Sequence, residues 1–186
     1  MPKATDYSLT PGKVSPRRIV PETIIKPEYV GNPEPTKHVG GDKYDEEQIQ
    51  RIRAASYLAA QALELVLSSA KVGMTTDDLD EIGHNFLVSA GAYPSTLGYR
   101  GFPKSLCSSL NEVICHGIPD DTILQDGDLV NIDISAFLNG VHGDTNGTVL
   151  IGQATEDKRL LVERTREAMM RGIKAAQPGR EVNIIG

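Results

Sequence analysis

Two aspartates, Asp133 and Asp144, are the residues of this sequence whose type and spacing best suit chemistry. They lie on two alternating β-like runs, and no lysine or arginine occurs between Lys104 and Lys158. Neighbouring carboxylates repel one another and are costly to remove from water unless a cation lies between them. Oxygen ligands suit hard or borderline divalent ions, although two aspartates are too few to hold one alone. The pair therefore predicts part of a divalent-metal site, with a water-facing hairpin as the alternative.

A β-hairpin is predicted to position these carboxylates. Asn139-Gly140, the strongest short signal for a two-residue type I′ turn, separates the two alternating runs within 128–150. Such a turn places Ser135 opposite Asp144, so Asp133 and Asp144 share one face as diagonal neighbours. The opposite face is apolar and is expected to be buried, since it consists of Val130, Ile132, Ile134 and Ala136.

Histidines and cysteines close to the hairpin in sequence are further candidates. His116 ends a strand-like run before a Gly-x-Pro turn and could project over a sheet face, although a lone histidine is more often a buried structural group. His142 shares strand parity with Asp144 and could line the same face near the turn. Cys107 and Cys115 do not match zinc-ligand spacing, and both are predicted to be small buried hydrophobic residues.

Helices must support this β-region. Amphipathic patterns predict one helix over 45–71, a second over 76–90 and a third that begins near Thr155. Between the second and third helices, short runs broken by glycine and proline over 92–151 indicate β-structure. The fold class is therefore mixed α/β (α+β).

The third helix resembles the first, which indicates an internal duplication. Each ends in a glycine break, at Gly73 and Gly179, and an apolar helix start follows each break. The second copy would extend only as far as residue 186, and 181–186 has the pattern of the first turns of a helix. We therefore expect one complete half of a duplicated fold and the beginning of the other.

Residues 1–44 form a proline-rich N-terminal extension in this prediction. Proline lacks a backbone donor and fixes φ, which excludes an interior helix or a central strand. A strap packed along its own domain or a loose tail is expected, and a docking arm that contacts an acidic partner through Arg17 and Arg18 is the alternative. No role is predicted for His38, in this arm, or for His84, on the second helix.

Composition excludes several classes of protein. The formal net charge of −6 argues against a general binder of nucleic acids or anionic membranes. No apolar run approaches the ~20 residues needed to span a bilayer. The N-terminus lacks the apolar core of a secretion signal. Two cysteines are too few for a disulfide scaffold, so a reduced, cytoplasmic location is expected.

Longer motifs resemble those of type 1 methionine aminopeptidases. They are GAYPSTLGYRGFPKS at 91–105, NEVICHGIP at 111–119, NID at 131–133 and HGDT at 142–145. The proline-rich arm is similar to the N-terminal extension of the actinobacterial form. The resemblance implies a pita-bread fold, with 45–186 as its first pseudo-symmetric half and the start of the second. It also implies a metallo-aminopeptidase that removes the initiator methionine from nascent proteins.

Matched position by position, the resemblance also implies roles for individual residues. Asp133 would chelate one of two divalent ions (Co, Mn, Fe or Zn), and Asp144 would bridge both. His116 would be the catalytic residue that hydrogen-bonds the substrate near the scissile amide. The methionine pocket would be formed by Thr96, Tyr99, Phe102 and Cys107. A monovalent-cation site would be formed by Asn111 and Asn131.

The remaining ligands of the family, one histidine and two glutamates, and its glutamate general base have no matching positions in this sequence. We therefore expect a fragment that is inactive alone. The implied partners are nascent polypeptide N-termini beginning with methionine, and the ribosome through the arm. Two alternatives are an X-Pro dipeptidase of the same fold, which the pocket residues disfavour, and a metal-free, ribosome-associated binding protein. The retained Asp133, Asp144 and His116 argue against the second alternative.

Overall fold

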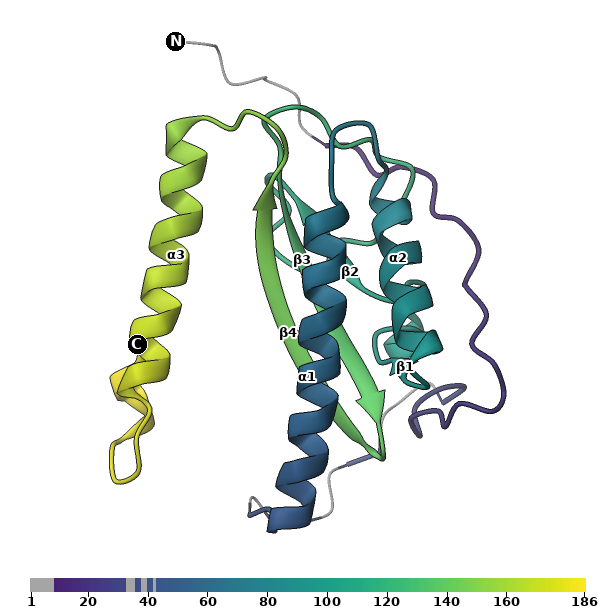
Figure 1. The fold of residues 1–186 in the computed structure, drawn as a ribbon, viewed down its shortest axis with the longest axis vertical. Helices are drawn as coiled ribbons and strands as arrows, with labels where there is room; N and C mark the ends of the chain where they lie inside the picture. The colour runs from purple at the N-terminus through teal and green to yellow at the C-terminus, as the bar shows by residue number, and fades with distance from the viewer. Residues whose placement is uncertain (1–8, 33–35, 38–39, 42) are drawn as a thin grey trace.

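The computed structural model describes residues 9–32, 36–37, 40–41 and 43–186 (Figure 1). Residues 1–8, where no secretion signal is predicted, lie outside these described residues, as does His38. The elements follow the predicted order of two helices, a β-region and a third helix. They are α1 (Glu46–Ser69), α2 (Thr76–Ser89), β1 (Tyr93–Pro94), η1 (Tyr99–Gly101), β2 (Cys107–Leu110), β3 (Leu129–Leu138), β4 (Val141–Leu150), α3 (Glu156–Ala175) and η2 (Val182–Ile185).

Side-chain caps explain where the first two helices begin. Asp45 caps α1 and Thr75 caps α2, and each forms a capping box with the residue three positions later. These caps satisfy backbone N–H groups that the first helical turn leaves unpaired. Both helices end within two residues of the predicted bounds.

Strand β3 is the centre of a four-stranded antiparallel sheet. It pairs with β4 along its whole length, and β1 and β2 pair with it on the other side. Asn139 and Gly140 both have positive φ, of 53° and 80°, as a type I′ turn requires. Ser135 lies opposite Asp144, which confirms the predicted register.

The apolar face of β3 packs against α1 (Figure 1). Small residues on α1 allow the helix to approach the sheet closely, and at Gly143 on β4 an added Cβ would overlap the backbone of Ala55 and Ser56. The buried residues that form this contact are Ala55, Ala59, Ala62 and Val66 from α1, and Val130, Ile132, Ile134 and Ala136 from β3.

Replacing Gly143 by alanine should therefore destabilise the fold by about 1–3 kcal/mol or more, because helix and strand must separate to admit the methyl group. Urea unfolding would measure the loss. Gly41→Ala is the matched control, since the nearest atom to its added Cβ is the backbone nitrogen of Lys43 at 4.0 Å. Equal unfolding midpoints for the two variants would contradict this packing.

Helix α3 stands apart from α1 and α2, on the far side of β4 (Figure 1). Several of its large apolar side chains are exposed, among them Leu161, Met169 and Ile173. The short η2 folds back against α3 and is also largely exposed. Across the described segments, no helix combines the length and apolarity needed to cross a membrane.

The N-terminal arm is a strap, the first of the two forms expected for it, and runs along the outer side of α2 (Figure 1). Its backbone is bonded to the domain near the start, where the Gly12 N–H donates to Asp120 at 2.7 Å. Farther along, Ile24 and Tyr29 are buried. The arm therefore belongs to the surface of the domain rather than forming a loose tail.

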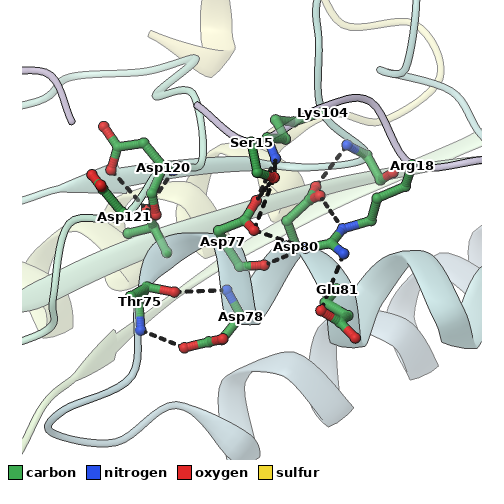
Figure 2. Close-up of polar contacts among 12 residues, drawn as sticks. Ser15, Arg18, Thr75, Asp77, Asp78, Asp80, Glu81, Lys104, Asp120 and Asp121 are labelled. Carbon is green, nitrogen blue, oxygen red and sulfur yellow. Dashed lines mark hydrogen bonds and ion pairs between the residues drawn. The ribbon is translucent and has the colours of Figure 1, made fainter. Parts of the chain in front are cut away.

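Arg18 finds its acidic partners within the chain, so the alternative of a docking arm is wrong for this residue. Its guanidinium contacts Asp77 and Asp80 at 3.0 Å and Glu81 at 3.1 Å, all on α2 (Figure 2). Arg17 is also engaged, because its Nη2 donates to the carbonyl of Gly101 at 2.8 Å.

A completely buried lysine completes this ionic cluster. Lys104 contacts Asp77, and its ammonium donates to Ser15 Oγ at 2.6 Å (Figure 2). Burial alone would raise the pKa of Asp77, but hydrogen bonds from Lys104 and Ser15 and the nearby positive charges hold it below its usual value. The cluster thus links the arm, α2 and the segment before β2.

Candidate metal centre and substrate pocket

The hairpin brings Asp133 and Asp144 together on its polar face. Burial raises the pKa of Asp133, and the Asp144 carboxyl, which lies within hydrogen-bonding reach, raises it further. The Ser135 hydroxyl donates to Asp144 Oδ1 at 2.8 Å and so orients that carboxylate. Neither aspartate forms an ion pair with any residue that the structure describes.

This arrangement fits a divalent cation. Two carboxylates on rigid adjacent strands present hard oxygen donors and repel one another until a positive charge lies between them. Within residues 9–32, 36–37, 40–41 and 43–186, no group of three or more histidine, cysteine, aspartate and glutamate side chains is arranged to hold a metal. Two carboxylates alone would be only a partial ligand set for such an ion.

His116 lies on the loop after β2, where the Ser108 N–H of β2 donates to the carbonyl of the next residue, Gly117, at 2.9 Å. The charge of His116 acts to lower the pKa of Asp133, against the larger effect of burial. The prediction that it ends a strand-like run is wrong, because β2 ends at Leu110 and Asn111 turns the chain with a φ of 49°. His116 itself has a left-handed φ of 55° and is exposed.

The two cysteines have different surroundings. Cys107 is buried, as predicted, and pairs across the sheet with Asp133. Burial, followed by the charges of Asp133 and Asp144, raises the pKa of its thiol to about 12, so the group stays neutral. The prediction is wrong for Cys115, which is exposed because the turn after β2 carries it into solvent.

The other predicted pocket residues lie on the connection between β1 and β2. Tyr99 is on η1 and is exposed, and Phe102 directly after it is half-buried. Thr96 is also half-buried, and its hydroxyl donates to the carbonyl of Lys104 at 3.1 Å. Because Cys107 opens β2 at the end of this connection, the segment leads directly to the carboxylate face.

The two asparagines predicted for a monovalent cation have separate partners. Asn111 Oδ1 accepts from the Leu129 N–H at 3.2 Å and lies 3.4 Å from the Lys158 ammonium. Asn131 Nδ2 donates to Thr148 Oγ1 at 3.0 Å. The monovalent-cation site therefore stays a prediction.

Sequence reasoning missed two residues next to the candidate site, Tyr29 and Ser95. Tyr29 of the arm contacts Tyr99, and Ser95 contacts His142. His142 does lie on the polar face, opposite Phe137, consistent with its strand parity. These contacts join segments far apart in the chain, so no local pattern signals them.

His84, for which the sequence predicts no role, has a structural one. Its Nδ1 is 2.7 Å from Ser105 Oγ, and its Nε2 is 3.1 Å from the carbonyl of Ile19 in the arm. Burial lowers the pKa of this histidine. The sequence places His84 on the second helix, but it does not indicate that the N-terminal arm covers this residue.

Comparison with known proteins decides the family. Residues 50–186 match metallopeptidase family M24. The chain belongs to this family. Family M24 membership implies divalent-metal binding, while the number and identity of the ions remain predictions.

Individual relatives agree with this assignment. Methionine aminopeptidase 2 of Mycobacterium tuberculosis is 53% identical over 188 residues, which cover 100% of this chain and 65% of that protein. A crystal structure of methionine aminopeptidase from Rickettsia prowazekii matches with a TM-score of 0.69 at 42% identity, over 70% of this chain and 52% of that one. The chain thus spans between half and two thirds of the length of these relatives.

A solved structure of lower sequence identity shows the fold alone. Prolidase from Pyrococcus furiosus matches with a TM-score of 0.64 at 23% identity, over 76% of this chain and 40% of that chain. Together the matches confirm the predicted pita-bread fold and the resemblance to methionine aminopeptidases.

Proposed function

We propose that this chain takes part in removing the initiator methionine from nascent polypeptides, by metal-assisted hydrolysis of the first peptide bond. The observation that carries the proposal is the facing pair of Asp133 and Asp144, with the neutral thiol of Cys107 beside them. The sequence relatives named methionine aminopeptidases support it at 40–53% identity.

Asp133 and Asp144 are the residues that would hold the metal, which we propose to be two divalent ions (Co, Mn, Fe or Zn). A metal in such a site supplies a Lewis acid and lowers the pKa of bound water. Ser135 keeps Asp144 oriented through its hydrogen bond. The ligand set is completed by one histidine and two glutamates if the family pattern holds, so we expect the 186-residue chain alone to be inactive.

The substrate would lie between the carboxylates and the loop that carries His116. From this exposed position, the His116 imidazole can donate a hydrogen bond to the peptide group that is cleaved. Tyr99, Phe102 and the Cys107 thiol would form the apolar walls for the methionine side chain, with Thr96 at the rim. An uncharged Cys107 suits this role, because a thiolate would disfavour an apolar side chain.

Nascent chains as substrates place the protein in the cytoplasm in this proposal. Ribosome contact through the arm would need groups other than the Arg18 guanidinium, which α2 occupies. Ile19 and Ile25 are exposed on the arm and are available for such a contact.

A peptide assay tests the proposal and separates the two alternatives. The full-length gene product should release methionine from Met-Ala-Ser, lose activity when EDTA strips its metal, and regain it with Mn²⁺ or Co²⁺. It should leave Ala-Pro uncleaved. Cleavage of Ala-Pro in preference to Met-Ala-Ser would indicate an X-Pro dipeptidase. Failure to bind any divalent ion in a calorimetric titration would indicate a metal-free binding protein.

A further inference from the structure

Tyr29 is an aromatic residue of the N-terminal arm that is buried in the domain. Its side chain is 5% exposed, and its hydroxyl donates to the carbonyl of Ser95 at 2.5 Å. Burial raises the pKa of this phenol above its usual value, so it stays a hydrogen-bond donor. Its position in the structure is therefore set by both packing and a polar contact.

The ring of Tyr29 packs against two residues on the side of the molecule that carries the candidate site. It meets Tyr99 edge to face, with ring centroids 5.1 Å apart and planes at 83°. It stacks with His142 at 6.1 Å and 18°. Edge-to-face aromatic pairs stabilise a defined geometry beyond the burial of their surface.

Ser95 connects Tyr29 to the carboxylate face. Its hydroxyl is 2.9 Å from His142 Nδ1, and its backbone N–H donates to the carbonyl of Ser135 at 2.9 Å. Ser135 in turn donates to Asp144. Tyr29 thus contacts Tyr99 directly, contacts β4 through its stacking on His142, and reaches β3 through one intermediate residue, Ser95.

The backbone around Tyr99 needs such support. Tyr99 lies in a single turn between Gly98 and Gly101, whose φ values are 89° and 84°, and Arg100 has a left-handed φ of 46°. Glycine gives a turn conformational freedom rather than rigidity. Tyr99 is also 43% exposed, and within its own segment the ring contacts the flexible Arg100 side chain, whose guanidinium carbon lies 5.7 Å from the ring centroid.

We propose that Tyr29 is a positioning residue for the methionine pocket, which holds the Tyr99 ring in the orientation that the substrate side chain requires. This inference rests on the proposed function, since that function assigns Tyr99 to the pocket. The N-terminal arm would then contribute to substrate specificity. Selectivity for methionine over a shorter or branched first residue would depend on Tyr29, which lies 70 positions before Tyr99 in the sequence.

The test uses Tyr29→Ala, Tyr29→Leu and Tyr29→Phe in the full-length gene product, with kinetics on Met-Ala-Ser and Leu-Ala-Ser. Loss of the ring contact should raise KM for the methionine peptide and lower the preference for methionine over leucine by roughly tenfold each, with kcat changed by less than about threefold. Tyr29→Phe keeps the ring and should stay within about threefold of wild type in both. Tyr29→Leu preserves apolar volume should the alanine variant fold poorly.

Ile24→Ala is the matched control. Ile24 is buried in the same arm and packs in a cluster with Tyr93 and Leu97, whereas the ring of Tyr29 contacts Tyr99. Ile24→Ala should lower the melting temperature as Tyr29→Ala does, yet leave KM and the methionine preference unchanged. A purely structural arm would make the two variants alike.

Three outcomes overturn the inference. Unchanged KM and preference in Tyr29→Leu and Tyr29→Ala would do so, as would an equal change in Ile24→Ala. These two leave the proposed function standing. Absence of methionine release by the wild-type protein would overturn the proposed function, and this inference with it.

Discussion

Replacing Asp133 by alanine should abolish methionine release while leaving the protein folded. Asp133 is half-buried beside Asp144 and is not ion-paired within the part of the chain that the structure describes, so its removal relieves a repulsion rather than breaking a stabilising contact. If the two carboxylates are the proposed metal ligands, the loss of one of them should lower kcat/KM by about three orders of magnitude or more. Divalent-metal affinity should fall in parallel.

Glu64→Ala is a suitable control for this prediction. Glu64 is an exposed carboxylate on α1, on the opposite side of the sheet from Asp133. Both variants should melt close to the wild-type temperature, and only Asp133→Ala should lose activity and metal. Full activity in Asp133→Ala, measured on Met-Ala-Ser with saturating Mn²⁺, would show that this carboxylate is not a ligand.

Replacing Lys104 by alanine should destabilise the protein by about 3 kcal/mol, since breaking a buried ion pair by removing one partner typically costs about 3–5 kcal/mol. Lys104 is fully buried, whereas Asp77 is 23% exposed and keeps Arg18, so we expect the lower end of this range. Urea unfolding at neutral pH would measure the loss. Lys71→Met, at an exposed position, should change stability by less than about 0.5 kcal/mol.

The pH dependence distinguishes an ionic contribution from a cavity. Because the folded-state pKa of Asp77 is depressed, its contribution to stability is present above its unfolded pKa of about 3.8 and is lost as the pH falls through the folded value. Lys104→Met retains most of the side-chain volume. The free energy of unfolding that this variant loses relative to wild type should therefore be constant above about pH 5 and should shrink below pH 4. A loss that does not change with pH would indicate that packing alone makes Lys104 important.

Local signals are sufficient to predict the hairpin and hence the carboxylate pair. Asn139-Gly140 specifies the turn, and alternation on both strands fixes which side chains share a face. Since register follows from the turn, the amino-acid sequence alone places Asp133 and Asp144 as neighbours. Helix bounds are predictable as well, because the caps at Asp45 and Thr75 are encoded within one turn.

Long-range contacts could not be predicted. Cys107 pairs with Asp133 across a loop of about 18 residues, and the short strand that carries it, CSSL, has no alternation to mark it. Lys104 is completely buried, which lysine almost never is without a partner. Its partners come from the arm and α2, and no local sequence pattern indicates that these distant segments contact Lys104.

The error at Cys115 has a local cause. A strand extended through 113–116 would have buried this side chain, but the chain leaves the sheet at Asn111 in a left-handed conformation. Asparagine tolerates that conformation better than most residues, yet it adopts it in only a minority of cases. The same turn leads into the loop that carries His116, so the feature that made the prediction for Cys115 wrong also sets the backbone path of the candidate catalytic residue.

That Asp133 and Asp144 together hold a divalent metal is tested most directly by anomalous diffraction. Crystals of the full-length gene product soaked in Mn²⁺ should show an anomalous peak between the two carboxylates, within the range of about 2.0–2.6 Å expected for metal–oxygen distances. Asp144→Asn crystals treated identically should show a much weaker peak or none. An active protein whose crystals contain no peak at these carboxylates would contradict the assignment of this face as the metal centre.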